Sequence, residues 1–515
     1  MADWNEGYVT DINYTYGYYT ELNPIRIPLA LSSMQIQSSN IRHVCELGFG
    51  QGVSAVIHAA AQGGASYWGT DFNPSQAAHA RSLAESAGIE CHFFDQSFDE
   101  FCTRDDLPEF DFISLHGIWS WISDHNRGVI VDFLRRKLKV GGVLYVSYNT
   151  LPGWASALPM RHLLSTYAQR MHGAGEGVVA RVEGAMDFFE KLAAVKPGYL
   201  NSNPKVLGRF EKMKGQNKEY LAHEYFNRDW EPMHFATMES WLQPAKLSYA
   251  CSAHLFDHVD AINFTAPQIE LLSATNDRSL RQSVRDMIVN QQFRRDYWIK
   301  GELRINAFQQ KKLLTEMKYV LIKVPQSVTY TIQTSVGEVQ LHKELYEPLV
   351  QLMSDFETRS IKDMLSTEQM KDPVVVGRFC EACMILTAHN VFAVVQSADN
   401  QEKSLEGVYR LNEHILELAE GETNIQLLAS PLTGGAINVD KLEQIYLLAM
   451  RRGFSAVSEI AEFSWQILRK QGVRMVREGK TLSTSSENIE ELNRLISIFT
   501  EQKLPLLKKM KVLKL

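Results

Sequence analysis

Four residues near the N-terminus combine an acidic side chain with glycines at alternate positions: Glu46, Gly48, Gly50 and Gly52. They follow a short apolar run that is typical of a buried strand, and a helical pattern begins directly after them. Glycines let the backbone approach a ligand closely, because a Cβ would block the ligand or forbid the required conformation. The first amides of the following helix point at the same place. This loop is therefore predicted to cradle a small molecule.

The spacing of the glycines separates two kinds of ligand. A dinucleotide fingerprint, G-x-G-x-x-G, would place its third glycine where this chain has Val53. That fingerprint does not require an acid before the first glycine, whereas here Glu46 occupies that place. The E-x-G-x-G-x-G pattern resembles the first motif of class I S-adenosylmethionine-dependent methyltransferases. The alternative is an ordinary tight turn between a strand and a helix. The strands that follow are needed to distinguish a cofactor-binding loop from such a turn.

Two further acids stand where strand-like runs end. Asp71 follows the loop by about 20 residues, the spacing at which a carboxylate can hold ribose hydroxyls. Asp95 ends the next run, and in the methyltransferase pattern an acidic or polar residue there accepts a hydrogen bond from the adenine amino group. Phe72 and Gln96, which follow these acids, are predicted to bind the cofactor as well. The simpler alternatives are a helix N-cap for Asp71 and a solvated surface for Asp95.

Strands and helices alternate through this part of the chain. Strands are predicted at 66–71, 90–95, 110–115 and 143–148, with a helix at 128–139. This alternation predicts a doubly wound parallel α/β sheet, in which ligands bind at the carboxyl ends of the strands. His116 follows the third of these strands and therefore belongs to the same edge. We expect it to contact the cofactor or the substrate, and the alternative is an ordinary hydrogen-bonded polar group.

Length and composition are those of an intracellular globular enzyme. At 515 residues, about three domains are expected. A net charge of −7 argues against wide contact with nucleic-acid phosphates. The sequence shows neither a signal-peptide core nor an apolar run long enough to span a membrane, so a cytoplasmic location is expected. Cys380 and Cys383 form a lone C-x-x-C pair without further ligands, so we expect core thiols and no metal site.

Further segments resemble one family. They are similar to bacterial methyltransferases that carry a methyltransferase regulatory domain, whose best understood members are rickettsial lysine methyltransferases that modify outer-membrane protein. The resemblance runs from about residue 10 to about residue 300 and is weaker at 429–437. The N-terminal aromatic segment is closer to the wider family than to the rickettsial enzymes. The segments are 13–31, 116–123, 148–154, 218–235 and 285–301.

The resemblance implies S-adenosyl-L-methionine as cofactor and transfer of its methyl group to a nucleophile, most simply the lysine amine of a protein. Tyr14, Tyr16, Tyr18 and Tyr19 are expected to belong to a segment that folds over the cofactor, although some of them could simply pack against the sheet. Among them we assign Tyr18 to the catalytic residues, together with His116.

Two tryptophans follow His116. Trp119 and Trp121 could form the wall of a channel for an alkylammonium group through cation–π contact, or could be ordinary buried residues. We assign Trp119 to the catalytic residues. A general base such as His116 would assist transfer to an amine, and transfer to a hydroxyl would require a base.

The domain organisation is expected to have three parts. Residues 1–260 form the catalytic domain, with a helical insertion at about 159–221 and a regulatory-domain motif at about 218–301. Within it, 240–252 is predicted to contain the closing antiparallel strand of the sheet. Residues 261–400 form a middle α+β domain, and 401–515 form a mainly helical C-terminal domain.

Two other functions compete with protein methylation. One is a small-molecule or glycan methyltransferase that uses the same cofactor site, with the extra domains acting as lid and oligomer contacts. The other is a catalytically silent binding module, against which the intact glycine loop argues. The sequence leaves open the acceptor, the number of methyl groups added, the use of a general base, the role of the C-terminal half and the oligomeric state.

Overall fold

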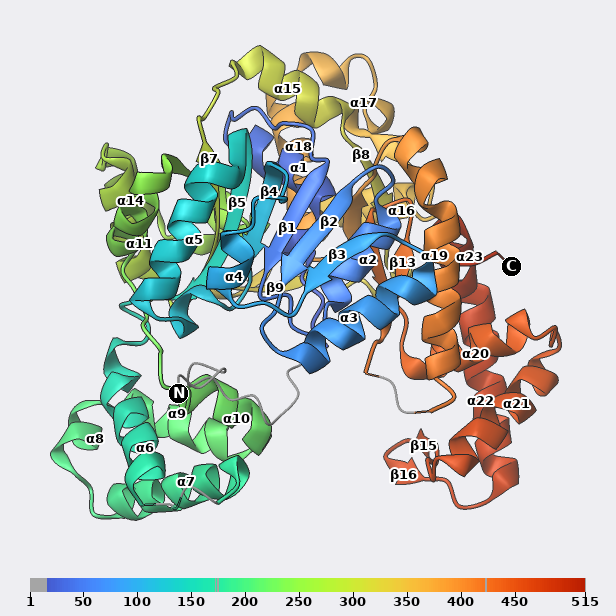
Figure 1. Ribbon diagram of the computed structural model, residues 1–515. Helices are drawn as coiled ribbons and strands as arrows, with labels where there is room; N and C mark the ends of the chain where they lie inside the picture. Colours follow the sequence, from blue (N-terminus) through green and yellow to red (C-terminus); the bar gives the residue numbers. More distant parts are fainter. Residues whose placement is uncertain (1–15, 172, 174–175, 422–423, 515) are drawn as a thin grey trace.

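A seven-stranded sheet with the order β3-β2-β1-β4-β5-β7-β6 forms the centre of the protein (Figure 1). The computed structural model describes residues 16–171, 173, 176–421 and 424–514. Strand β7 is antiparallel to both its neighbours, and the pairs among β3, β2, β1, β4 and β5 are parallel. The predicted doubly wound α/β sheet is confirmed. Its strands are β1 (His43–Leu47), β2 (Ser66–Thr70), β3 (Cys91–Phe94), β4 (Phe110–Leu115), β5 (Leu138–Asn149), β6 (Leu247–Ser252) and β7 (Phe293–Lys300).

Two hydrophobic cores lie on the two faces of this sheet. Successive strand residues point to opposite faces, so Val44 and Phe112 belong to one core while Cys45 and Ile113 belong to the other. The helices that pack on the first face are α1 (Ile27–Ser33), α2 (Val53–Ala61) and α3 (Pro74–Ala87). Those on the second face are α4 (Phe98–Cys102), α5 (Asp124–Lys137) and α11 (Phe235–Leu242).

The last two strands of the sheet differ from the prediction. The run at 240–252 does contain a strand, β6, but β6 is parallel to β5; the antiparallel strand is β7, at 293–300. Strand β7 is hard to predict because it buries charges. Within it, Arg294 donates hydrogen bonds to Asp296 (2.8 Å) and to Asp286 (2.6 Å) in the preceding helix. The sheet therefore passes the domain boundary that we expected at residue 260.

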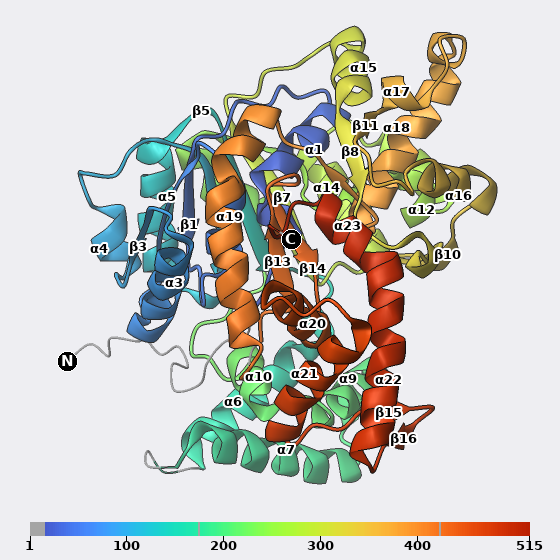
Figure 2. The same ribbon diagram turned by 90° about the vertical axis from the view of Figure 1, so that its right-hand side faces the viewer.

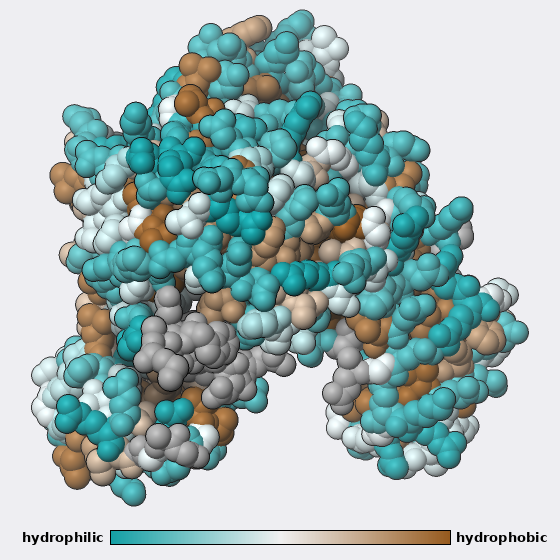
Figure 3. All heavy atoms as spheres, viewed as in Figure 1, coloured by the Kyte–Doolittle hydropathy of each residue, from teal (hydrophilic) through white to brown (hydrophobic). Residues whose placement is uncertain are grey.

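The predicted helical insertion is present and has a core of its own. It consists of α6 (Leu158–Arg170), α7 (Val178–Ala194), α8 (Gly198–Ser202), α9 (Pro204–Lys214) and α10 (Lys218–Tyr225). Buried aromatic residues such as Phe189 and Phe210 hold these helices together. In Figure 1 the insertion is the lobe below the sheet, and in Figure 3 it projects from the main body as the lower left lobe. Helices α12 (Asp260–Asn263), α13 (Ala266–Ala274) and α14 (Arg278–Val289) lead from β6 to β7.

The middle part, which follows β7, mixes helices with short strands. Strands β11 (Arg359–Ser360), β8 (Lys318–Leu321) and β12 (Phe392–Val394) form one small sheet. Strands β9 (Thr331–Thr334) and β10 (Gly337–Gln340) form an antiparallel hairpin. The helices are α15 (Ala307–Glu316), α16 (Lys343–Leu352), α17 (Ile361–Met364) and α18 (Pro373–Ala388). Cys380 and Cys383 lie on α18 as free thiols.

The C-terminal part begins with a long helix, α19 (Ala398–Leu418), whose N-terminus is capped by Ser397. The expected division at residue 400 therefore falls inside this helix. Helix α19 packs on α2 and α3 and so covers the outer side of the catalytic domain (Figure 2). The remaining elements are β13 (Leu427–Ser430), β14 (Gly435–Asn438), α20 (Lys441–Arg451), α21 (Val457–Lys470), β15 (Val476–Arg477), β16 (Lys480–Thr481), α22 (Ser485–Ile498) and α23 (Leu504–Lys509). No helix in the described ranges combines the length and apolar character needed to cross a bilayer.

Candidate active site

The glycine loop lies between β1 and α2 in a conformation that needs its glycines. Gly48, Gly50 and Gly52 all have positive φ angles, between 58° and 75°. A Cβ at Gly48 would lie 2.3 Å from Ile118 Cδ1, and a Cβ at Gly52 would lie 2.4 Å from Ala80 Cβ. These close approaches bring the loop against neighbouring elements and leave its backbone in the wall of a pocket at the carboxyl edge of the sheet.

Asp71 holds this loop in place. Its carboxylate accepts a hydrogen bond from the Gly50 amide (2.9 Å) and another from the Asn73 amide (3.0 Å). The side chain is buried yet still lines the pocket. Burial raises the pKa of Asp71 to about 6, while the two amides oppose that rise. Because each carboxylate oxygen can accept more than one hydrogen bond, Asp71 can hold the loop and a ligand hydroxyl together.

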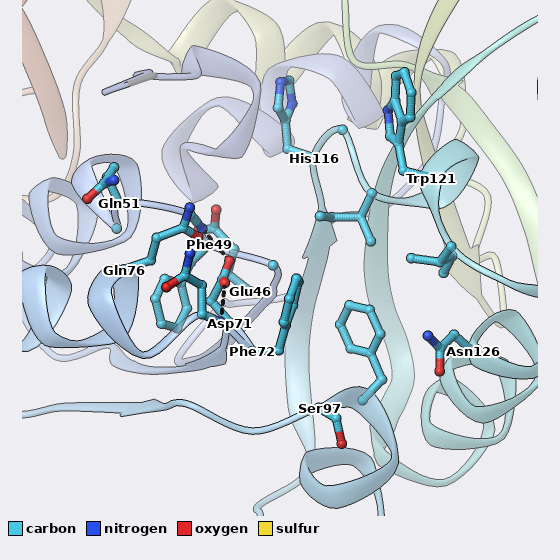
Figure 4. Close-up of a pocket in the computed structure, with 18 of the residues that line it drawn as sticks. Glu46, Phe49, Gln51, Asp71, Phe72, Gln76, Ser97, His116, Trp121 and Asn126 are labelled. Atoms are coloured by element: carbon cyan, nitrogen blue, oxygen red, sulfur yellow. Dashed lines mark hydrogen bonds between the residues drawn. The ribbon is translucent and has the colours of Figure 1, made fainter. Parts of the chain in front are cut away.

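Glu46 is the second buried carboxyl group in the pocket wall. Burial, with a further contribution from the negative charge of Asp71, raises the pKa of Glu46 to about 8. Figure 4 shows Glu46 and Asp71 on one side of the pocket, Trp121 and Asn126 on the other, and Phe72 between them. A positive group on a ligand would favour ionisation of both acids.

The end of β3 contributes differently from our prediction. Asp95 lies outside the pocket, where its half-exposed carboxylate pairs with Arg81 at 2.9 Å. The three residues that follow it, Gln96, Ser97 and Phe98, line the pocket instead. The backbone amide of Gln96 donates a hydrogen bond to the Thr70 hydroxyl (3.2 Å), which positions this residue. Of the two residues predicted to bind the cofactor at this strand end, Gln96 therefore lines the pocket and Asp95 does not.

His116 lies at the centre of the pocket edge, directly after β4. Its Nδ1 is 2.8 Å from the Tyr145 hydroxyl, and its ring stacks on the ring of Tyr19 with centroids 3.5 Å apart. Burial lowers the pKa of His116 to about 4, so the imidazole is neutral at pH 7. The nearby charges of Glu21 and Arg295 form a pair with each other at 2.5 Å. His116 thus places a rigid, neutral ring in the wall.

Two of the predicted catalytic residues lie away from the pocket, and a neighbour takes the place of each. Tyr18 points away from the pocket toward the C-terminal part, and the pocket is lined by Tyr19. Trp119 is fully buried in the core, and the pocket is lined by Trp121. In both segments the sequence identifies the aromatic cluster but not which ring faces inward. Tyr14 lies outside the described residues.

The far end of the pocket is formed by residues that the sequence did not indicate. Asn227 and Asp229 both line the pocket. Arg161 relates Asn227 to Trp121, because it donates to the Asn227 carbonyl (3.0 Å) and lies over the Trp121 ring at 5.9 Å. Asn227 and Asp229 come from the segment between the helical insertion and α11. They lie within the resemblance at 218–235, which is the only signal that could have pointed to them. The pocket therefore extends from the glycine loop to the base of the insertion.

Comparisons with known proteins fit this geometry. Residues 44–142 match the model of a family described as a methyltransferase domain, and residues 217–300 match that of a predicted methyltransferase regulatory domain. An uncharacterized protein of Synechocystis is 38% identical over 511 residues, which is 98% of this chain and 99% of the relative. The chain belongs to the methyltransferases that carry a methyltransferase regulatory domain.

More distant relatives of this methyltransferase include rickettsial proteins. An uncharacterized protein of Rickettsia prowazekii is 24% identical over 310 residues, which is 59% of this chain and 54% of that protein. Among solved structures, PKMT2 from Rickettsia typhi in complex with AdoHcy matches with a TM-score of 0.68 and 15% identity. That match covers 96% of this chain and 99% of the rickettsial chain, so the fold is shared over nearly the whole length.

The methyltransferase uses S-adenosylmethionine, and its pocket fits that cofactor. The glycine backbone provides a surface for close approach, Asp71 and Gln96 provide acceptors, and Phe72 provides an aromatic face. The buried acids Glu46 and Asp71 suit a ligand that carries positive charge. When bound, the cofactor supplies an activated methyl group on a positive sulfonium. The protein contributes a water-excluding wall and alignment of the acceptor, which is the main requirement for a displacement of this kind.

Proposed function

We propose that this methyltransferase transfers a methyl group to lysine amines of a protein. The observation that carries the proposal is the composition of the far end of the pocket. Trp121, Asn227 and Asp229 are among the residues that line the pocket there. The Asp229 carboxylate already pairs with Arg228 at 3.1 Å, so a ligand ammonium would share this carboxylate with Arg228. An aromatic face next to a carboxylate suits an alkylammonium side chain, which gains both cation–π and ionic attraction.

The neutral state of His116 supports an amine acceptor. A lysine amine has an unperturbed pKa of about 10.4 and must lose a proton before it attacks. A neutral imidazole adds no positive charge opposite a sulfonium, and a buried site next to a sulfonium lowers the pKa of the incoming amine. With a pKa of about 4, His116 is a weak base. We therefore assign His116 and Tyr19 to alignment of the reacting groups.

The cofactor contacts are part of the same proposal. We assign the ribose hydroxyls to Asp71 and the adenine edge to Gln96, with Phe72 against the ring. The glycine loop and Glu46 take the methionine portion, which carries the positive groups. The lining of the pocket supports these assignments. Asp95, which pairs with Arg81 outside the pocket, has no part in them.

Two broader features support a protein substrate, which could be a surface protein, and a cytoplasmic enzyme. The segments that resemble the wider family of the rickettsial lysine methyltransferases extend beyond the catalytic sheet into the regulatory domain, and the N-terminal segment is closer to the wider family than to the rickettsial enzymes. All six cysteines, at 45, 91, 102, 251, 380 and 383, are free thiols, which fits the reducing environment of the cytoplasm.

A small-molecule or glycan acceptor is the competing function, and one experiment separates the two. A bacterial lysate is divided into protein and low-molecular-mass fractions, and each is incubated with the enzyme and S-adenosylmethionine labelled in the methyl group. We expect enzyme-dependent label in the protein fraction, and an Asp71→Ala variant should reduce it strongly. Label confined to the low-molecular-mass fraction would refute the proposal.

A further inference from the structure

We infer that the C-terminal hairpin β13–β14 positions the segment that walls the cofactor pocket, with Gly435 and Tyr18 as the positioning residues. The capping segment, residues 17–23, lies near the start of the described chain. The hairpin lies more than 400 residues later. Helix α2 connects the two, because it begins at the glycine loop and packs against both hairpin strands.

Hydrogen bonds join the capping segment to the hairpin directly. The Ala436 amide donates to the Tyr18 hydroxyl (2.9 Å), and the Asn23 side chain donates to the Thr433 carbonyl (3.2 Å). On the α2 side, Gln62 donates to the Gly434 carbonyl (3.0 Å) and to the Asn23 side chain (3.0 Å). These contacts are buried or partly buried, so they are shielded from competition by water.

The fit between hairpin and capping segment depends on a missing side chain. A Cβ built on Gly435 would lie 2.4 Å from the Tyr18 hydroxyl and 2.7 Å from the Asn23 side-chain nitrogen. Gly435 does not have a positive φ angle. The position therefore needs glycine for the close approach of Tyr18 and Asn23 rather than for its backbone conformation.

Helix α2 provides the other half of the Tyr18 site. His58 Nε2 is 3.2 Å from the Tyr18 hydroxyl, and burial lowers the pKa of His58 to about 3. The hydroxyl is thus held between a neutral imidazole and the Ala436 amide. Because both partners are buried, Tyr18 has little freedom to move.

Tyr19, the next residue of the capping segment, connects Tyr18 to the pocket. Tyr19 stacks on His116 and lines the pocket, and its amide donates to the Ser54 hydroxyl at 3.0 Å. Ser54 in turn donates to the Gly17 carbonyl (3.3 Å), another part of the pocket wall. A displacement of Tyr18 by the hairpin would therefore move the ring that covers His116.

The test uses titration calorimetry with S-adenosylhomocysteine and needs no knowledge of the methyl acceptor. Gly435→Ala should raise the Kd about tenfold while the number of binding sites per chain stays near that of the wild type. The matched control is Gly421→Ala in the same C-terminal part, where a Cβ would meet only the Leu418 carbonyl at 3.8 Å. That control should bind as the wild type does. Purely structural damage would reduce the number of competent sites and leave the Kd unchanged, and that result would overturn the inference.

A second variant keeps the inference testable if Gly435→Ala folds poorly. Tyr18→Phe removes the hydroxyl that contacts both the Ala436 amide and His58, and it should raise the Kd at least about threefold. In the double variant the new methyl group no longer meets the hydroxyl, so the Kd should fall below that of Gly435→Ala alone. Wild-type affinity in Tyr18→Phe, or strictly additive losses in the double variant, would contradict a direct link between the two residues.

Discussion

The ring of Tyr19 lies on the ring of His116, with the planes inclined by 27° and the centroids 3.5 Å apart. This contact closes the pocket where the N-terminal segment meets the carboxyl end of β4. It joins a residue of the capping segment to a residue of the sheet edge. We therefore regard the pair as the side of the pocket that aligns the reacting groups.

Replacing Tyr19 tests that role. Tyr19→Ala removes the ring and opens His116 to water, so the rate of label transfer should fall at least about tenfold. Tyr19→Phe retains the stacked ring and should retain most of the rate. Initial rates with labelled cofactor and a protein fraction measure both variants. Equal rates in Tyr19→Ala and the wild type would rule out this function of the stack.

The two acids at the strand ends should respond differently to substitution. Asp71→Asn replaces one of the two carboxylate oxygens, which accept from the Gly50 and Asn73 backbone amides, by an NH₂ group that cannot accept. The loop then loses a charge-assisted bond, and the Kd for S-adenosylhomocysteine should rise more than about tenfold. Asp95→Asn, outside the pocket, is the control and should leave the Kd unchanged. Titration calorimetry measures the Kd of both variants. A larger rise in Kd for Asp95→Asn than for Asp71→Asn would refute our placement of the ribose at Asp71.

The raised pKa of Glu46 predicts that cofactor binding depends on pH. With a pKa of about 8 the free carboxyl group is mostly protonated at pH 7.5, and a positive ligand favours its ionised form. Binding should therefore release protons at pH 7.5, and affinity should increase as the pH rises toward 8. The pKa of Asp71 is lower, about 6, so that residue contributes little at this pH.

Calorimetry in two buffers with different ionisation enthalpies measures the proton release. In Glu46→Gln the release should disappear and the affinity should no longer depend on pH between 7 and 8. The same release in the variant and the wild type would show that the proton comes from another group.

Substitution of Trp121, which lines the pocket, and of Trp119, which lies in the core, should separate an effect on substrate binding from an effect on stability. Trp121→Ala should raise the concentration of protein substrate needed for half-maximal rate and leave the Kd for S-adenosylhomocysteine unchanged. Trp119→Ala removes a fully buried ring from the core and should cost about 3–5 kcal/mol of stability. Thermal unfolding and transfer rates together check this difference. A Trp121→Ala variant that loses stability instead would place Trp121 in the core and not at the substrate.

The sequence predicts the local patterns better than the directions of side chains. The glycine loop and the strand ends at Asp71 and His116 follow from residue types that have few alternative explanations. The choices between Tyr18 and Tyr19, and between Trp119 and Trp121, depend on which ring faces the pocket. Both members of each pair are aromatic, so composition alone does not distinguish them.

The remaining differences between the sequence-based prediction and the structure also arise from contacts that form on folding. Strand β7 carries Arg294 and Asp296, whose charges are buried only because they pair with each other and with Asp286. The sequence pattern does not predict such pairing, because the partners meet only in the folded protein. The contact between Tyr18 and the C-terminal hairpin joins residues 418 positions apart, and no local pattern encodes it.

The most direct test of a lysine acceptor compares two protein pools. One pool is untreated, and in the other the lysine amines have been acetylated before incubation with the enzyme and labelled S-adenosylmethionine. Mass spectrometry then locates the label in each pool. We predict label on lysine side chains of the untreated pool and its loss from the acetylated pool. Label that persists after acetylation, on another type of side chain, would contradict the proposed function.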